Sequence, residues 1–341
     1  MYCPLIHLRL HTSGYPVAML LVLLLAGCMQ AQTQRICAGV PEPGKTMLLV
    51  GQDVQSIDAY LKQVDPNPAG LMLYTDLRTL SGLQRPADDG AGQRHAAHFT
   101  QNPACDHMVF QLGLYLVDDL LNITSGKRDK QIVKLGQWIN SVKRPVYLRI
   151  GYEFDGPWNH YQPDHYIHAY RHIVDIMRRQ PVTNVAYVWA SAAVPTYQSH
   201  PIDAWYPGDD YVDWIGLSVF QQPAGTLGTM DDIHRLCQFA QAKKRPIGIM
   251  ESTPYGSIGG IADRQWDQWF KPVFKLIEQY DIAMFCYINA NWQSQRMWTN
   301  QGWGDSRLQG NPSILQRWLK QTTQPRYLHA TDDLLAELKC K

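Results

Sequence analysis

The chain has 341 residues, a formal net charge of +1 at pH 7, and a composition that is 45% hydrophobic and 11% aromatic. This length can bury one large core or two modest ones. A charge near zero argues against a nucleic-acid-binding protein, which would need a basic face, so no nucleic-acid partner is expected. The 11 Trp and 18 Tyr residues suit core packing and, for some, stacking on flat apolar faces such as those of sugar rings.

Residues 1–27 have the pattern of an export signal. The apolar run Val17–Ala26 follows a weakly basic start, and it is too short for a membrane span but typical of a signal-peptide core. The run leads into Leu25-Ala26-Gly27-Cys28, which resembles the lipobox of bacterial lipoproteins, whose Cys is acylated and becomes the first residue. The other interpretation is an ordinary secretory signal with a chance Cys.

The lipobox resemblance predicts a lipoprotein signal peptide over residues 1–27, a lipid on Cys28, and a lipidated tether over residues 28–44. Met29 and Gln30 follow the Cys, with no Asp after it. By resemblance to lipoprotein sorting rules, this implies an exported bacterial lipoprotein anchored in the outer membrane, so that one expected partner is the membrane itself.

Five other cysteines would remain after export, an odd number that leaves at least one free thiol. They are Cys37, Cys105, Cys237, Cys286 and Cys340. Cys286 lies in an apolar segment and is predicted to be a free buried thiol, whereas Cys37 and Cys340 lie near the two ends and could form one disulfide. The sequence has no C-x-x-C motif or His-rich cluster, so neither a metal site nor a cofactor is predicted.

Eight apolar segments of strand length follow the tether. Each is hydrophobic almost throughout rather than alternating, which is typical of parallel strands covered on both faces. The segments are 45–51, 70–76, 107–117, 144–153, 184–192, 212–220, 245–251 and 282–292.

Amphipathic helical patterns lie between most of these segments. They cover residues 125–144, 163–179, 230–244, 263–280 and 311–321. Eight strand–helix units in a chain of this size predict a single (β/α)8 barrel over 45–325, with 326–341 as a C-terminal tail packed on it. The alternative is an open doubly wound sheet, but the Gly-rich phosphate loop expected after its first strand is missing. A monomer is expected.

In a (β/α)8 barrel the functional groups lie at the carboxyl ends of the strands. Those ends carry Asp76, Asp118, Glu153, Phe220, Glu251 and Trp292. Glu153 and Glu251 end the fourth and seventh segments, which face each other across a barrel. A retaining glycosidase needs two carboxylates about 5–5.5 Å apart, one as acid/base and one as nucleophile. The plainer interpretation is that either Glu is a solvated charge at a strand end.

Aromatic residues surround Glu153 in the sequence and would help to keep its carboxyl protonated. They are Tyr152, Phe154 and Trp158. Trp158 and Tyr161 are candidates to line a cleft, and Asp118 and Asp155 to bind sugar hydroxyls. His160 is expected to lie in a polar loop.

Four segments resemble glycoside hydrolase family 26, one of the clan A barrels. YLRIGYEFDGPWNHY (147–161) resembles the acid/base segment of that family, with an Arg four residues before the Glu and a Gly and Trp after it. The other three follow in the family's order. They are WYPGDDYVDWIGLSVF (205–220), PIGIMESTPYG (246–256) and MWTNQGWGDSRLQGNPSILQRW (297–318).

The resemblance implies a retaining, endo-acting hydrolase of β-linked polysaccharide or oligosaccharide, of the β-mannan, β-xylan or β-glucan type. It assigns Glu153 as acid/base and Glu251 as nucleophile, places Arg149 beside the nucleophile, and makes Trp292 the floor for the sugar being cleaved. The substrate-binding residues expected with them are Arg149, Tyr152, Asp155, Trp158, Phe220, Tyr255, Tyr287 and Trp292.

The sequence departs from the family pattern at three places. Tyr152 replaces a His, Phe154-Asp155 replaces Met-Asn, and Phe220 replaces a sixth-strand Tyr whose hydroxyl touches the nucleophile. That hydroxyl contact is therefore absent or comes from elsewhere, and Tyr255 or Tyr287 could supply it.

Two other functions remain open at this stage. A non-catalytic glycan-binding lipoprotein would keep Trp158 and Trp292 but could lose either Glu; the presence of both favours an enzyme, whereas Phe220 favours the binder. A barrel enzyme acting on phosphate esters would need a phosphate-binding loop and metal ligands, which the sequence lacks.

Overall fold

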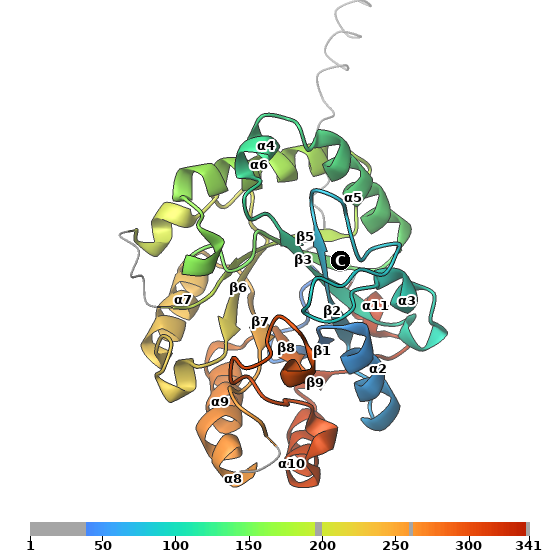
Figure 1. Ribbon diagram of the computed structural model, residues 1–341, viewed down its shortest axis with the longest axis vertical. Coiled ribbons are helices and arrows are strands. Elements are labelled where there is room, and N and C mark those ends of the chain that lie inside the picture. Colours follow the sequence, from blue (N-terminus) through green and yellow to red (C-terminus); the bar gives the residue numbers. More distant parts are fainter. Residues whose placement is uncertain (1–38, 195–199, 259–261, 339–341) are drawn as a thin grey trace, which may run out of the picture. The chain divides into compact units, whose positions relative to one another are not determined.

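Eight parallel strands form a closed ring that is surrounded by helices (Figure 1). The computed structural model describes residues 39–194, 200–258 and 262–338. The signal peptide, Cys28, and the proposed Cys37–Cys340 disulfide all involve residues outside these ranges. The strands are β1 (Thr46–Gly51), β2 (Gly70–Asp76), β3 (Val109–Tyr115), β4 (Val146–Ile150), β5 (Val185–Ser191), β6 (Trp214–Val219), β7 (Ile247–Ser252), β8 (Met284–Ile288) and a short β9 (Tyr327–Leu328).

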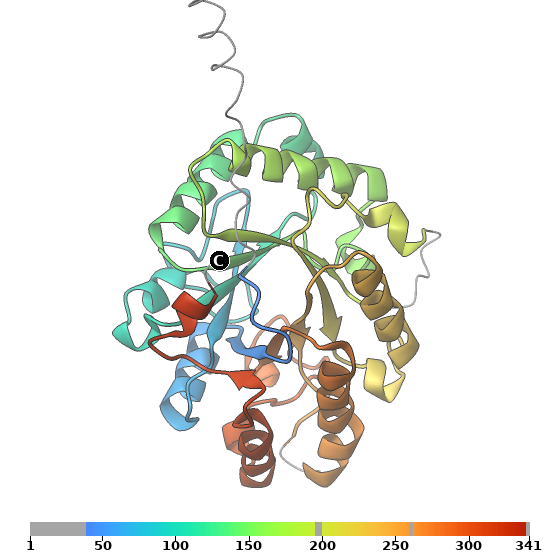
Figure 2. The same cartoon turned by 180° about the vertical axis from the view of Figure 1, so that it is seen from behind.

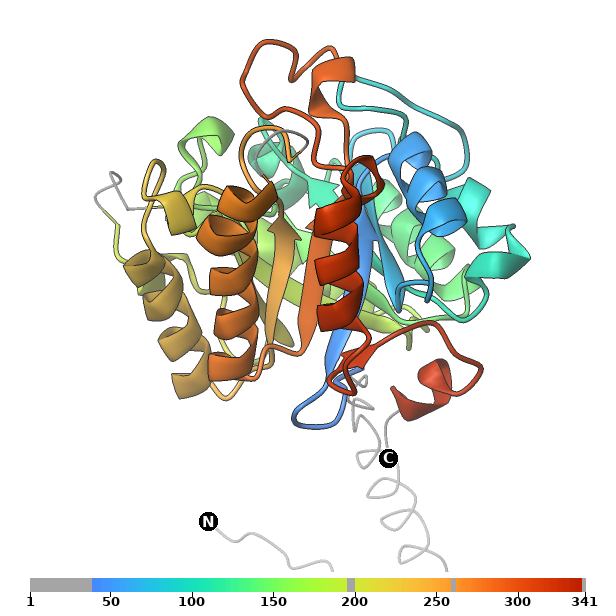
Figure 3. The same ribbon diagram turned by 90° about the horizontal axis from the view of Figure 1, so that it is seen from below.

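The ring closes because β1 pairs in parallel with both β2 and β8. From β2 to β7, each strand pairs with the one that follows it in sequence, so the predicted (β/α)8 barrel is confirmed and the open sheet is excluded. Helices cover the outside of the ring, as the view from behind also shows (Figure 2). They are α2 (Val54–Gln63), α3 (Ala96–Thr100), α4 (Leu120–Thr124), α5 (Asp129–Ser141), α6 (Pro163–Arg178), α7 (Met230–Ala242), α8 (Ala262–Gln265), α9 (Lys271–Tyr280) and α10 (Pro312–Thr322), whereas α11 (Leu334–Glu337) lies at one end of the ring (Figure 3).

Side chains pack in two layers, one inside the ring and one between the strands and the helices. Along β1, Met47 and Leu49 join the inner layer, whereas Leu48 and Val50 join the outer one. Both faces of each strand are therefore covered, which explains why the sequence segments are hydrophobic throughout. Cys105, Cys237 and Cys286 are buried free thiols, as predicted for Cys286.

The two ends of the barrel differ. The long loop after β8 rises above the strand tips, while β9 and α11 lie at the opposite end (Figure 3). There β9 pairs with β1, and Leu334 and Leu338 join the inner layer of side chains. The carboxyl end is thus the end built from long loops. Within the described ranges, no helix is long and apolar enough to cross a bilayer.

Candidate active site

A β-bulge in β7 turns Glu251 into the barrel. Leu217 of β6 pairs with Ile249, but the next residue, Ser218, pairs with Glu251, so β7 holds one more residue, Met250, than its neighbour. Simple alternation would direct Met250 inward and Glu251 outward, and a bulge re-aims the side chain that follows it. Gln111 of β3 stabilises this irregularity, because its Nε2 donates to the Met250 carbonyl at 2.7 Å.

Arg149 of β4 reaches across the barrel to Glu251. Its Nη2 lies 2.6 Å from Glu251 Oε1, and the Arg149 side chain is fully buried. A buried ion pair holds its members tightly, because either charge alone would be costly to bury. Its guanidinium also lies over the rings of Tyr74 and Tyr152, at 5.3 and 4.6 Å from their centroids. Arg149 therefore lies beside the proposed nucleophile, where the family resemblance places it.

Glu153 lies three residues beyond the end of β4, in a tight loop. Its φ of +54° is a left-handed conformation that few non-glycine residues adopt. Asn159 Nδ2 holds this backbone by donating to the carbonyls of Tyr152 and Glu153 at 3.1 and 2.7 Å. The indole Nε1 of Trp158 donates to Glu153 Oε2 at 3.0 Å, so Trp158, which is 44% exposed, covers the carboxyl from the solvent side.

The two glutamates interact with each other. Burial, followed by the negative charge of Glu251, raises the pKa of Glu153 to about 8, against smaller lowering effects of Ser218 and Arg149. Phe154 does not contribute in the way the sequence indicated. Its ring is buried in the outer layer and stacks on Trp189 at 4.4 Å. At neutral pH Glu153 is thus a protonated acid, whereas Glu251 faces a guanidinium.

Tyr74 is a site residue that the sequence did not reveal. It lies in the middle of β2 and packs against the inner layer beside Tyr152, with ring centroids 5.8 Å apart. Burial and then the charge of Glu251 raise the pKa of Tyr74 well above its usual range. Gly113 is the feature of the sequence that could have indicated this site residue, because a glycine inside a strand often marks close approach of neighbouring groups.

Aromatic rings form a wall on the β6–β8 side of the carboxyl end. Trp303 contacts Phe220, Tyr255 and Trp292 with ring centroids 5.1–5.4 Å apart, and Trp298 packs on Trp292 at 5.4 Å. Trp292 is only 4% exposed, and its Nε1 donates to Ser306 Oγ at 3.1 Å. Trp298 and Trp303, which the sequence analysis did not select, are half-buried and form the more accessible part of this wall.

Three candidates from the sequence lie away from the carboxyl pair. The Tyr287 side chain lies in the outer layer and its hydroxyl donates to the Ser306 carbonyl at 2.6 Å, so it cannot supply the contact missing at Phe220. Asp155 accepts from Ser191 Oγ and the Ala192 amide at 2.6 and 2.7 Å, which ties the β4 loop to β5 instead of binding sugar. Tyr161 is 4% exposed and stacks on Tyr166, so it is a core residue.

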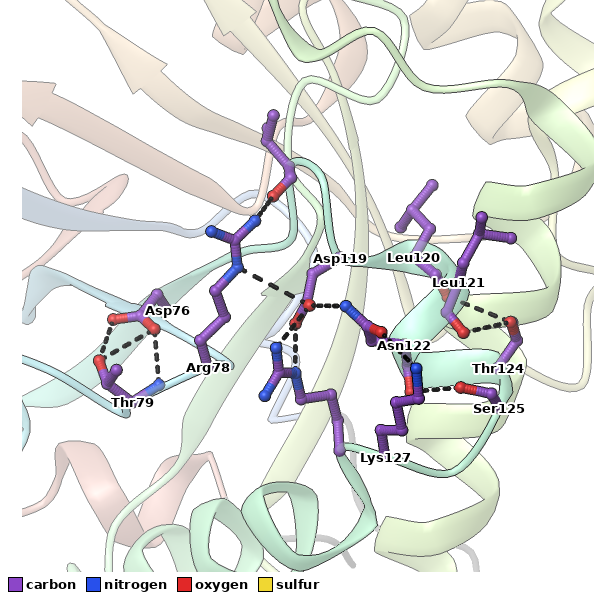
Figure 4. A network of polar contacts seen from close by, with 12 residues as sticks. Asp76, Arg78, Thr79, Asp119, Leu120, Leu121, Asn122, Thr124, Ser125 and Lys127 are labelled. Carbon is purple, nitrogen blue, oxygen red and sulfur yellow. Dashed lines mark hydrogen bonds and ion pairs between the residues drawn. The ribbon is translucent and has the colours of Figure 1, made fainter.

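The acidic residue that ends β2 and the buried one that follows β3 mainly fix their own loops (Figure 4). Asp76 accepts from the Thr79 amide at 2.8 Å. Asp119, and not the exposed Asp118, is the buried acid after β3, and Arg128 binds it with two hydrogen bonds of 2.7 and 2.8 Å. His160 is exposed, as expected for a polar loop. In the part of the chain that is described, no cluster of His, Cys, Asp and Glu could hold a metal ion.

A closed barrel with two buried carboxyl groups at its carboxyl end, one protonated and one beside an arginine, defines a glycosidase-type hydrolase. The profile of Glycosyl hydrolase family 26 matches residues 91–259. The beta-1,3-xylanase TXYA of a Vibrio species is 32% identical over 323 residues, which cover 88% of this chain and 69% of that protein. The chain belongs to glycoside hydrolase family 26 and is a glycosidase.

Two further comparisons agree with this assignment. A beta-1,3-xylanase of an Alcaligenes species is 32% identical over 325 residues, covering 88% of this chain and 68% of that protein. A solved GH26 beta-mannanase from Bacteroides ovatus superposes with a TM-score of 0.60 at 15% identity, covering 91% of this chain and 95% of that one. At 15% identity, the likeness to this mannanase shows the fold alone.

Proposed function

We propose that this protein is a retaining endo-β-xylanase that cleaves β-1,3-linked xylan by a double displacement. The observation that carries the mechanism is the interacting pair Glu153 and Glu251, one buried and protonated and the other paired with Arg149. Two carboxyl groups in such unlike environments match the acid/base and the nucleophile of a retaining glycosidase. The linkage rests on the two relatives, which are both named beta-1,3-xylanases and match along most of this chain.

Action within a long chain is supported by the exposed apolar surface. Large exposed apolar side chains lie at the end of β3, in α4, and on the loops that follow β4, β7 and β8, spread around the carboxyl end. They are Tyr115, Leu121, Trp158, Tyr255 and Met297. Exposed apolar groups gathered on one face mark an interaction surface, and aromatic rings among them suit stacking on successive sugar residues. A surface that extends on several sides of the carboxyl pair fits a polysaccharide that passes over it.

A digest of matched polysaccharides tests the substrate and the mode of action. We expect cleavage of β-1,3-xylan to a ladder of oligosaccharides, with much weaker action on β-1,4-xylan, β-1,4-mannan and β-1,3-glucan. Product size by chromatography, measured early in the digest, separates endo from exo action. Preferred cleavage of mannan or glucan would overturn the linkage, and binding without cleavage of any member of the panel would favour the non-catalytic glycan-binding protein.

We also propose that the exported protein begins at an acylated Cys28 and is held at the outer membrane. The support is the Leu25-Ala26-Gly27-Cys28 sequence after a short apolar run. Mass spectrometry of the native N-terminal peptide should show a lipid-modified Cys28, and Cys28→Ser should release the protein from the membrane fraction. An unmodified N-terminus at another residue would contradict the anchor without bearing on the chemistry. The monomeric state stays a prediction.

A further inference from the structure

We propose that the hydroxyl of Tyr74, carried by β2, positions the carboxylate of Glu251 by donating a hydrogen bond to it. Tyr74 would then supply the hydroxyl that Phe220 lacks. The inference rests on the proposed function in one respect, because it takes Glu251 as the nucleophile.

The strand register brings Tyr74 and Arg149 together over a glycine. Tyr74 pairs with Gly113 of β3, and Gly113 pairs with Arg149 of β4, so the three residues lie side by side at one level of the barrel. A Cβ atom on Gly113 would lie 2.7 Å from Tyr74 Cδ1 and 2.9 Å from Arg149 Nη2. Because Gly113 has no side chain, the Tyr74 ring and the Arg149 guanidinium can both occupy the space beside it.

The position of the Tyr74 ring is fixed by two neighbours. Arg149 lies over it at 5.3 Å, and Tyr152 meets it edge-on at 5.8 Å. The same Arg149 holds Glu251 at 2.6 Å. Because one guanidinium contacts both groups, the phenol ring and the carboxylate lie close together, and the charge of Glu251 is near enough to contribute to the raised pKa of Tyr74.

Both the Tyr74 hydroxyl and the Glu251 carboxylate can form a further hydrogen bond, which supports a hydrogen bond between them. The Tyr74 hydroxyl is buried and has no well-aligned acceptor among the described residues, and Glu251 Oε1 is buried with only its ion pair to Arg149. Leaving a buried donor and a buried acceptor unpaired is costly, so a small rotation that joins them is favourable. The raised pKa of Tyr74 keeps its proton in place, and the hydroxyl is therefore a donor throughout the working pH range.

The other tyrosines near the site have their hydroxyls engaged elsewhere or face a different group. Tyr255 donates to the Gln301 carbonyl at 2.8 Å, and Tyr287 donates to the Ser306 carbonyl at 2.6 Å. Tyr152 is the one rival, since the charge of Glu251 also contributes to its raised pKa. Tyr152 follows β4 and lies next to Glu153 in the chain, so a variant at each position separates the two candidates.

The test compares Tyr74→Phe with the wild type on the polysaccharide that the wild type cleaves. We expect kcat to fall by about 10- to 100-fold, the usual effect of losing one hydrogen bond to a charged group, with a smaller change in KM. A hydrogen bond to a carboxylate favours its ionised form. The acidic limb of the kcat/KM profile should therefore move to higher pH, a shift that a purely structural role would not produce.

Tyr187→Phe is the matched control. Tyr187 lies in β5, its hydroxyl is also buried without a partner, and its ring faces the outer layer. That variant should keep the wild-type kcat and pH profile. Thermal unfolding of both variants checks that Tyr74→Phe stays folded, and if it does not, Gly113→Ala, which intrudes on the same space, should produce the same shift of the acidic limb.

The outcomes separate this inference from the proposed function. Wild-type kcat and pH profile in Tyr74→Phe, or the same shift in Tyr152→Phe alone, would overturn the role of Tyr74 while leaving the proposed function intact. Full activity in Glu251→Gln, measured beside them, would instead overturn the assignment of the nucleophile.

Discussion

Glu251→Gln is expected to lower kcat/KM by at least about 10⁴-fold, because an amide cannot attack the anomeric carbon to form a glycosyl-enzyme. Arg149 would then lie fully buried opposite a neutral amide, and a buried charge that loses its partner destabilises the fold. We therefore expect a lower unfolding temperature as well. Kinetics should be compared at a temperature at which circular dichroism shows the variant and the wild type equally folded.

The nucleophile assignment has a stereochemical check that does not depend on stability. Two displacements leave the anomeric configuration unchanged, so NMR of the first-formed wild-type product should show the configuration of the substrate. In Glu251→Ala, added azide should restore some cleavage of an activated aryl glycoside and yield a glycosyl azide of inverted configuration. First-formed wild-type product of inverted configuration would refute a double displacement through Glu251 even if this residue proved essential.

Glu153→Gln is expected to cost about 10²- to 10⁴-fold in kcat on polysaccharide, the usual contribution of a general acid. The pKa of Glu153, raised to about 8, means that the acid is protonated at neutral pH and is lost as the pH rises through that value. Wild-type activity should therefore fall above about pH 8, and this basic limb should be absent from the residual activity of the variant.

A matched substrate distinguishes loss of the acid from loss of the fold. An aryl glycoside with a nitrophenol leaving group needs little protonation, so Glu153→Gln should form its glycosyl-enzyme at close to the wild-type rate. In Glu153→Ala, azide should accelerate turnover and give a glycosyl azide of retained configuration. Equal losses on the polysaccharide and the aryl glycoside, with no effect of azide, would mean that Glu153 has another role.

The barrel could be predicted from the sequence because its physical cause is local. Strands covered on both faces need hydrophobic residues at consecutive positions, and all eight such segments contain a strand of the ring. The strand-end rule then selected both glutamates without structural information. What it could not give was side-chain direction. On β8, Cys286 and Ile288 face inward and Tyr287 faces outward, a choice that is undetermined in a segment without alternation.

The rest of the site depends on contacts between strands that are far apart in sequence. From the sequence alone, Tyr74 is indistinguishable from an ordinary core aromatic residue. Its place in the site becomes clear only from its strand register with Gly113 and Arg149. Asp155 has the right residue type and place for a sugar contact, but the amide of Ala192, directly after β5, donates a hydrogen bond to it. These contacts form only in the folded chain. A single sequence shows which residues are present but not which of them meet.

The extra residue in β7 makes the reacting centre sensitive to how that strand pairs with β6 more than to its hydrophobic composition. Exchanging one hydrophobic side chain for another at Ile247 or Ile249 would alter packing against the helices. Pairing Met250 with Ser218 in an unbroken ladder would instead turn the Glu251 carboxylate toward the helices. A barrel with that pairing would have a more regular β7 and no nucleophile in its site. In this architecture an active enzyme and an inert sugar-binding barrel can thus differ by one step in the register of a buried strand.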